Sequence, residues 1–162
     1  MINRIFIGAF AVIGLLVSSC SVNDEEPSYE ENYKKGLEYL TDNAQREGVI
    51  CTQSGLQYEV LREGDEDGKT PVSNSYVRCH YKGSFIDGNV FDSSYDSGNP
   101  IVFSLSSVII GWTEGLQYMK EGAMYRFFIP YYLAYGAYGN YAIPPYSTLI
   151  FEVELIEVLQ DQ

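Results

Sequence analysis

The sequence predicts an α+β fold, in which a twisted antiparallel β-sheet wraps around one short α-helix and a second short helix lies near the N-terminus. Three observations predict it. Residues 149–155 alternate apolar and acidic side chains, as expected of a strand with one buried face. Asp87-Gly88 separates two strand-like runs and is a strong hairpin signal. Residues 109–119 carry large apolar side chains at helical spacing.

The elements follow from local patterns along the chain. Tyr33, Leu37 and Leu40 recur at helical spacing, and Gly48 is a suitable end for that helix. The second helix has Gly122 as its expected C′ residue. The ranges expected are a helix over 30–47, a strand in 55–64, a hairpin over 75–94, a helix in 108–122, and strands in 123–130 and 147–159.

Composition limits the function. The 162 residues suffice for one domain with a substantial core. Acidic residues outnumber basic ones 22 to 10, for a net charge of −12, which argues against nucleic-acid binding. His80 is the single histidine, and the chain has no group of cysteines and histidines at the spacing of metal ligands, so we expect no metal site. Cys51 and Cys79 are open to pairing in an exported protein, but a buried thiol is favoured for Cys79.

The N-terminus is typical of an exported protein. Thirteen residues without a polar side chain follow Arg4, a length that fits the apolar region of a signal peptide better than a membrane span. The run ends in Val-Ser-Ser before Cys20, which resembles the lipobox of bacterial lipoproteins. Acylation of Cys20 is therefore favoured over an ordinary signal peptide or an uncleaved anchor, and several acyl chains would hold the protein stably.

These patterns divide the chain into a lipoprotein signal peptide (1–19), an acidic tether (20–29), an N-terminal helical segment (30–48) and one domain (52–162). The tether region holds five carboxylates between Ser21 and Glu31 and is typical of solvated chain. It also resembles the acidic signal that sends some lipoproteins to the cell surface. We expect a lipid anchor in the bacterial outer membrane, with the protein on either the periplasmic or the outer surface of that membrane.

A tyrosine-rich segment lies near the C-terminus. Six of the sixteen residues between Pro130 and Ser147 are tyrosines, and glycines and prolines interrupt them. The segment has neither a strand nor a helix period. Loops of this length without secondary structure are uncommon in compact domains and are often functional.

Five motifs occur together: HYKGSFIDGNVFDSS, VIIGWTEGLQYMKEG, RFFIP, LAYGAYG and IPPYSTLIFEVELI. In this order and spacing, residues 55–158 closely resemble FKBP-type peptidyl-prolyl cis-trans isomerases. The lead-in NAQREGVICTQSGLQYEVLREG resembles the macrophage-infectivity-potentiator branch. The resemblance implies the FKBP-like α+β fold, isomerisation of X-Pro bonds without a cofactor, proline-containing polypeptides as substrates, and macrolides as ligands.

The resemblance also implies a site. It places Trp112 as the floor under the proline ring and the tyrosine-rich segment as a flap over the pocket. It assigns a hydrogen bond to the substrate to the backbone N–H of Ile109 and another to the hydroxyl of Tyr135, and it puts the Asp92 carboxylate at the edge. The apolar positions implied are Tyr81, Phe91, Val108, Ile109 and Phe151 as walls, Ile101 beside them, and Ile143 at the rim.

Taken singly, each of these residues is more typical of core packing or of a turn than of a binding site. Only their joint order and spacing favour a site. The sequence also departs from the family pattern at Ser97, where many relatives carry an arginine, at Ile101, where an aromatic residue is frequent, and at Ile110. A non-catalytic proline-peptide module or holdase chaperone using the same groove is therefore the alternative to the enzyme. A host-contact or glycan-binding lipoprotein ranks last.

Overall fold

The computed structural model describes residues 29–159; the predicted signal peptide, Cys20 and nearly all of the tether lie outside them. These residues form two α-helices, seven β-strands and four short 3-10 turns. The elements are α1 (Tyr29–Asn43), β1 (Val49–Cys51), β2 (Gln57–Arg62), β3 (Tyr76–Phe85), β4 (Val90–Ser93), η1 (Ser94–Ser97), β5 (Ile101–Ser104), η2 (Leu105–Ser107), α2 (Ile110–Gly115), η3 (Leu116–Tyr118), β6 (Met124–Ile129), η4 (Tyr131–Leu133) and β7 (Leu149–Leu159).

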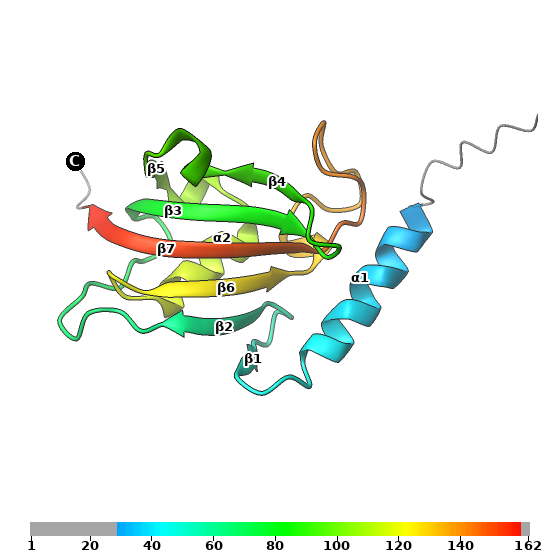
Figure 1. Ribbon diagram of the computed structural model, residues 1–162, viewed down its shortest axis with the longest axis horizontal. Coiled ribbons are helices and arrows are strands. Elements are labelled where there is room, and N and C mark those ends of the chain that lie inside the picture. The colour runs from blue at the N-terminus through cyan, green and yellow to red at the C-terminus, as the bar shows by residue number, and fades with distance from the viewer. Residues whose placement is uncertain (1–28, 160–162) are drawn as a thin grey trace, which may run out of the picture.

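The strands form one antiparallel sheet in the order β1-β2-β6-β7-β3-β4, and β5 also pairs with β3. The strands β7 and β3 are the longest and run side by side at the centre (Figure 1). The helix α2 crosses behind this sheet in the same view, and α1 stands at one end of it. The predicted α+β fold is therefore confirmed.

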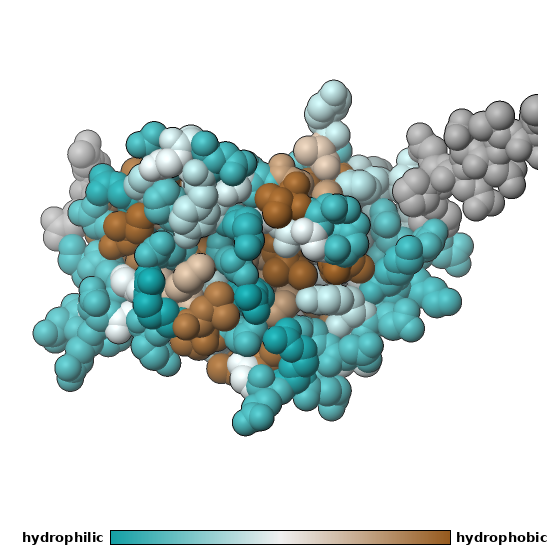
Figure 2. Space-filling view, viewed as in Figure 1, coloured by the Kyte–Doolittle hydropathy of each residue, from teal (hydrophilic) through white to brown (hydrophobic). Residues whose placement is uncertain are grey.

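The core lies between α2 and the inner face of the sheet. Leu149, Val153 and Leu155 of β7 are fully buried, which agrees with the alternation in the sequence. Leu116 and Met119, on the predicted helical stripe, are also fully buried and belong to the same cluster. The outer face of the sheet, toward the viewer in Figure 2, is mainly hydrophilic with scattered hydrophobic groups.

The predicted hairpin joins β3 and β4. Gly88 has φ of 88°, a left-handed conformation that favours glycine, and the Asp87 carboxylate accepts a hydrogen bond from the N–H of Asn89 at 2.9 Å. The register shifts between Gly83 and Ser84. Such an irregularity increases the local twist and re-aims the side chains beside it.

Two strands were not predicted from the sequence. The strand β1 has three residues and β5 has four, too few for a period of two to stand out. Pairing with β2 and with β3 supplies their hydrogen bonds, so their strand conformation depends on tertiary partners.

Both predicted helices end earlier than expected. The helix α1 stops at Asn43, whose buried side chain donates to Gln57 Oε1 at 2.8 Å, and Gly48 lies in the following turn. The expectation that Gly122 caps the second helix was wrong, because α2 ends at Gly115 and passes into η3. Gly122 instead adopts φ of 82° in the turn before β6, where its N–H donates to Leu155 O at 2.8 Å.

The two described cysteines are free thiols. Cys51 lies on β1 and Cys79 on β3, four strand positions apart in the sheet, which corresponds to about 19 Å. A disulfide needs Cα atoms within roughly 7 Å, so these two cannot pair in this fold. Burial, with a smaller effect of Glu154, raises the pKa of Cys79 to about 12, as expected for an inert buried thiol.

Within residues 29–159, neither helix combines the length and the apolarity needed to span a bilayer. The same residues contain no group of three or more His, Cys, Asp or Glu side chains arranged to hold a metal ion.

Candidate active site

A cavity of about 570 Å³ opens between α2, the strands β3, β4, β5 and β7, and the start of the tyrosine-rich segment. The structure brings nine of the ten predicted pocket residues together in its lining. These are Tyr81, Phe91, Asp92, Ile101, Val108, Ile109, Trp112, Tyr135 and Phe151.

Trp112 forms the centre of the aromatic wall. It projects from α2, is 4% exposed, and has the rings of Tyr81, Phe103 and Phe151 around it at centroid distances of 5.2–5.3 Å. The Tyr81 and Phe151 contacts are edge-to-face, a geometry that aromatic pairs prefer. Its indole Nε1 is buried without a hydrogen-bond partner among the described residues.

Phe91 extends this wall from β4. Its ring lies edge-on to Phe151, with centroids 5.5 Å apart, and Gly83 of β3 lies beneath both. A Cβ atom at Gly83 would approach Phe91 Cζ and Phe151 Cε1 to 2.7 Å each. Only a glycine at this position leaves both rings where they are.

The polar side chains that line the cavity include two tyrosine hydroxyls and one carboxylate. The Tyr81 hydroxyl donates to Asp92 Oδ2 at 2.5 Å. Burial raises the pKa of Tyr81, and its hydrogen bond to Asp92 raises it further. Burial and the charge of Asp92 raise the pKa of Tyr135 in the same sense. Both hydroxyls therefore stay protonated near neutral pH and can act as hydrogen-bond donors.

The backbone of the segment before α2 also faces the cavity. Ile109 precedes the helix in extended conformation, with φ of −61° and ψ of 149°, and its carbonyl accepts from Trp112 N at 2.9 Å. Its own N–H has no hydrogen-bond partner among residues 29–159. That N–H is available to a ligand carbonyl, as the resemblance implies.

Ile143 is the predicted pocket residue that does not line the cavity. Its side chain is 3% exposed and packs in the core. Asn140 turns the chain there, because its side chain accepts from the N–H groups of Ala142 and Ile143 at 2.9 and 2.8 Å. The turn directs Ile143 inward and away from the rim.

Only the start of the tyrosine-rich segment, which was predicted to form a flap, lies at the cavity. Ala134 and Tyr135 line the cavity, whereas Tyr138 and Tyr141 are 94% and 108% exposed and point to solvent. Two others, Tyr131 and Tyr146, pack on each other at a centroid distance of 5.1 Å, outside the cavity lining.

Four lining residues were not among the predicted site residues: Phe103, Ser107, Ile110 and Ala134. Phe103 lies two residues after Ile101 on β5 and so shares its face, a signal that requires the strand to be recognised first. Ile110 was noted only as a departure from the family pattern.

Ser97, at the position where many relatives carry an arginine, has a local role in this chain. Its hydroxyl donates to Ser94 O at 2.9 Å and helps to close the turn η1. Among the described residues, no cationic side chain forms an ion pair with Asp92. The Asp92 carboxylate interacts instead with Tyr81.

Comparison with known proteins agrees with this geometry. Residues 68–156, more than half of the chain, match the family described as FKBP-type peptidyl-prolyl cis-trans isomerase. Residues 17–60 match the family described as the domain amino terminal to FKBP-type peptidyl-prolyl isomerase. This chain belongs to the FKBP-type peptidyl-prolyl cis-trans isomerase family.

Individual relatives place it within the family. The chain is 49% identical over 128 residues to the FKBP-type peptidyl-prolyl cis-trans isomerase FkpA of Aeromonas hydrophila, covering 79% of this chain and 47% of that protein. It is 49% identical over 126 residues to the FKBP-type 22 kDa peptidyl-prolyl cis-trans isomerase of Escherichia coli (strain K12), covering 77% and 60%. The chain thus spans about half to three fifths of the length of these FKBP-type relatives.

Among solved structures, the crystal structure of FkpA from Escherichia coli superimposes with a TM-score of 0.78 at 44% sequence identity. The match covers 82% of this chain and 62% of that one. The fold that the two chains share therefore extends over most of this chain.

Proposed function

We propose that this protein is a peptidyl-prolyl cis-trans isomerase that accelerates X-Pro isomerisation in exported or cell-envelope proteins. The observation that carries the proposal is the aromatic cavity around Trp112, supplied with hydrogen-bond donors, in a chain of the FKBP-type family. Proline-containing polypeptides are its proposed substrates.

The chemistry explains why such a cavity suffices. An X-Pro amide interconverts over a barrier of ~18–20 kcal/mol, because twisting removes amide resonance. Uncatalysed exchange takes tens to hundreds of seconds. A catalyst has to bind the twisted amide more tightly than the planar one. An apolar pocket excludes the water that stabilises the polar planar amide, and it can hold the ring and carbonyl in the twisted arrangement.

Each side chain then has a role. Trp112 supports the proline ring from below, and Tyr81, Phe91 and Phe151 enclose it. The Ile109 N–H and the Tyr135 hydroxyl hold the carbonyl groups on either side of the twisting bond. The Asp92 carboxylate keeps the Tyr81 hydroxyl in place and lies at the edge where the carbonyl rotates.

No proton transfer is needed in the rate-determining step. None of the thirteen lining residues is a histidine, cysteine or lysine, the side chains best suited to act as a base near neutral pH. The raised pKa values of Tyr81 and Tyr135 keep both hydroxyls as donors. Rate enhancement then rests on shape, exclusion of water and hydrogen bonds.

A protease-coupled X-Pro peptide assay on the full chain tests the proposal. We expect the cis-to-trans rate to rise in proportion to enzyme concentration and Trp112→Ala to lose that activity. Leu37→Ala is a matched control, because Leu37 lies on α1, 56% exposed and outside the cavity lining. A wild-type rate equal to the uncatalysed rate, with the protein folded, would exclude the enzyme.

A binding module or holdase is the second candidate function. The fully exposed rings of Tyr138 and Tyr141 favour it, since exposed aromatic side chains beside a groove suit contact with unfolded chains. Suppression of client aggregation should then survive Tyr135→Phe and fall in the double variant Tyr138→Ser/Tyr141→Ser. If the double variant protects clients as well as the wild type, these rings do not bind them.

Macrolide ligands are proposed to occupy the same cavity. Trp112, Ile109 and Tyr135 support this, and Ile101 in place of an aromatic wall residue suggests weaker affinity. Trp112 is the single tryptophan, so quenching of its fluorescence reads binding directly. Absence of both quenching and competition with peptide at saturating ligand would count against binding in this cavity.

The proposed location is the outer membrane, through acylated Cys20. The supporting pattern is Val-Ser-Ser-Cys after the apolar run, which lies outside the described residues. Labelled palmitate should mark the wild type and leave Cys20→Ala unlabelled. Equal labelling of the two would exclude the anchor. Periplasmic and surface exposure are distinguished by staining intact cells before and after replacing Asp24, Glu25 and Glu26 with alanine.

A further inference from the structure

The helix α1 packs directly on the tyrosine-rich segment. The ring of Tyr33 lies edge-on to Tyr131, with centroids 5.8 Å apart, and to Tyr146, at 6.0 Å. The three rings form one aromatic cluster, because Tyr131 and Tyr146 also contact each other. Figure 1 shows α1 standing beside the loop between β6 and β7.

Two further contacts join the same surfaces. Asn32 Nδ2 donates to Pro145 O at 3.2 Å. Gly36 is buried against Thr148, and a Cβ atom at Gly36 would lie 2.4 Å from Thr148 Oγ1. The helix thus approaches the loop more closely at this point than any other residue would allow.

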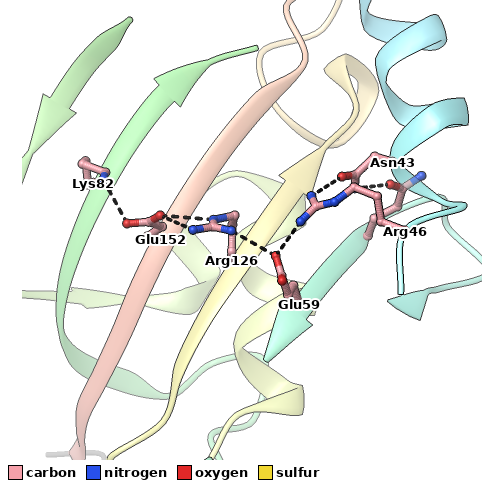
Figure 3. Close-up of polar contacts among 7 residues, drawn as sticks. Asn43, Arg46, Glu59, Lys82, Arg126 and Glu152 are labelled. Carbon is pink, nitrogen blue, oxygen red and sulfur yellow. Dashed lines mark hydrogen bonds and ion pairs between the residues drawn. The ribbon is translucent and has the colours of Figure 1, made fainter. Parts of the chain in front are cut away.

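The other end of α1 is fixed to the sheet. Asn43 is 3% exposed and bonds to Gln57, whose amide donates to Leu40 O at 2.8 Å. Polar contacts continue across the outer face of the sheet, as Figure 3 shows. This series of side-chain hydrogen bonds and ion pairs runs from Asn43 through Arg46, Glu59, Arg126 and Glu152 to Lys82. The helix is thus held by contacts at both of its ends.

The loop residues that touch α1 also hold the main chain around Tyr135. The Tyr131 carbonyl accepts from Ala134 N at 3.0 Å and from Gly136 N at 2.8 Å. Tyr146 N donates to Gly136 O at 3.1 Å. Both neighbours of Tyr135 are therefore hydrogen-bonded to residues of the aromatic cluster.

Tyr146 has a strained backbone. Its φ of 59° is the one positive value at a non-glycine residue in 29–159. Such a conformation persists only where surrounding contacts over-determine it, and it is often found at functional sites. At Tyr146, the surrounding contacts include the rings of Tyr33 and Tyr131.

We propose that α1 is a brace for the active site, and that Tyr33 and Gly36 are positioning residues that set the placement of the Tyr135 hydroxyl. The inference rests on the proposed isomerase function, because Tyr135 matters only if it contacts substrate. The helix α1 does not contact the Tyr135 hydroxyl. It positions this hydroxyl through the aromatic cluster and the hydrogen bonds of Gly136.

The first test removes the Tyr33 ring in the full chain. Tyr33→Ala should lower kcat/KM for an X-Pro peptide by about three- to tenfold, the effect expected of losing one well-placed hydrogen bond. The separate variant Tyr33→Phe keeps the ring and should have wild-type activity. Leu37→Ala, which also shortens a large exposed side chain on α1, should leave activity unchanged.

A double-mutant cycle decides whether the effect passes through Tyr135. In a Tyr135→Phe background, Tyr33→Ala should change kcat/KM by less than about twofold, since the hydroxyl it positions is already absent. A loss as large as in the wild-type background would overturn the proposal. So would a Tyr33→Ala variant with wild-type kcat/KM.

Gly36→Ala tests whether the close approach of α1 to the loop is needed for activity. Alanine has a higher helix propensity than glycine, but its Cβ would push α1 away from Thr148. Activity should fall, and Gly36→Ala/Thr148→Ala should recover most of it, because the second change removes the Oγ1 atom that the new Cβ would meet at 2.4 Å and leaves only the Thr148 Cβ, at 3.2 Å. Failure of the double variant to recover activity while it remains folded would contradict a positioning role for Gly36.

Hydrogen exchange separates this proposal from the proposed function. In Tyr33→Ala, the amides of Gly136 and Tyr146 should exchange at least about tenfold faster, while that of Val153 in β7 stays protected. Unchanged exchange at Gly136 would overturn the brace even if the protein is an active isomerase. Faster exchange in a protein without activity would uphold the brace and exclude the enzyme.

Discussion

Gly83→Ala should distort the active site from beneath. A Cβ atom at this position would lie 2.7 Å from Phe151 Cε1 and from two carbons of Phe91. Carbon atoms pack at about 3.5–4.0 Å, so one or both rings must move by roughly 0.8 Å. Gly83 is paired with Phe151 on β7 and with Asp92 on β4, so the backbone cannot retreat without breaking the sheet.

The expected magnitude follows from overpacking and from misplacement of the walls. Overpacking a well-packed site costs ~1–3 kcal/mol of stability. A displacement near 1 Å at a catalytic group can cost up to ~10²-fold in rate. Because the rings enclose the substrate without bonding to it, we expect about a tenfold fall in kcat/KM, equivalent to ~1.4 kcal/mol.

Gly88→Ala is the matched control for this experiment. Gly88 has φ of 88° and nothing within 4 Å of an added Cβ, so alanine there costs ~1–2 kcal/mol of backbone strain without touching the cavity. Urea unfolding and the X-Pro assay, run under conditions where both variants are folded, should show similar losses of stability and a loss of activity in Gly83→Ala alone. If the two variants have kcat/KM within twofold of each other, the assignment of Phe91 and Phe151 as walls is refuted.

Four further changes test the site and the sheet. Trp112→Ala should lower the free energy of unfolding by ~3–5 kcal/mol in urea and remove activity, because it opens the centre of the aromatic wall; retained activity would contradict its role. Tyr135→Phe should leave the melting temperature unchanged and reduce kcat/KM by a few-fold to roughly tenfold, the equivalent of ~0.5–1.5 kcal/mol. Activity should be flat between about pH 6 and 8, since burial and a neighbouring carboxylate raise the pKa of Tyr135 further above its usual value near 10; a bell-shaped profile centred near neutrality would point to a catalytic base. Burial alone would raise the pKa of Glu152, but Arg126 and Lys82 hold it below 4.5, so its contribution to stability is present above that pH and is lost as pH falls through the folded value. Glu152→Gln should therefore destabilise the protein by about 1 kcal/mol at pH 7 and by less at pH 3 in urea titrations, whereas a constant difference would show that its charge is irrelevant.

Local sequence patterns were sufficient to predict elements whose burial or turn conformation depends on neighbouring residues. The buried face of β7 and the turn at Gly88 could be predicted, because a period of two and a left-handed turn are properties of neighbouring residues. The resemblance carried by the motifs around Trp112 and Tyr135 predicted nine of the side chains that line the cavity, because it points to a family whose fold brings them together. The strand β5, and with it Phe103, was missed because four residues carry no recognisable period.

The sequence by itself determined the class of fold, the aromatic composition of the pocket and the length of the tyrosine-rich segment. Tertiary structure decided what each tyrosine in that segment does. Tyr131 and Tyr146 pack on Tyr33, about one hundred residues earlier in the chain, while Tyr138 and Tyr141 remain in solvent. The segment has no internal period, so its side chains are oriented by two glycines of positive φ, by the Asn140 turn and by the position of α1. Partners so distant in sequence are brought together by the strand pairing of the sheet, and a local pattern carries no information about such contacts.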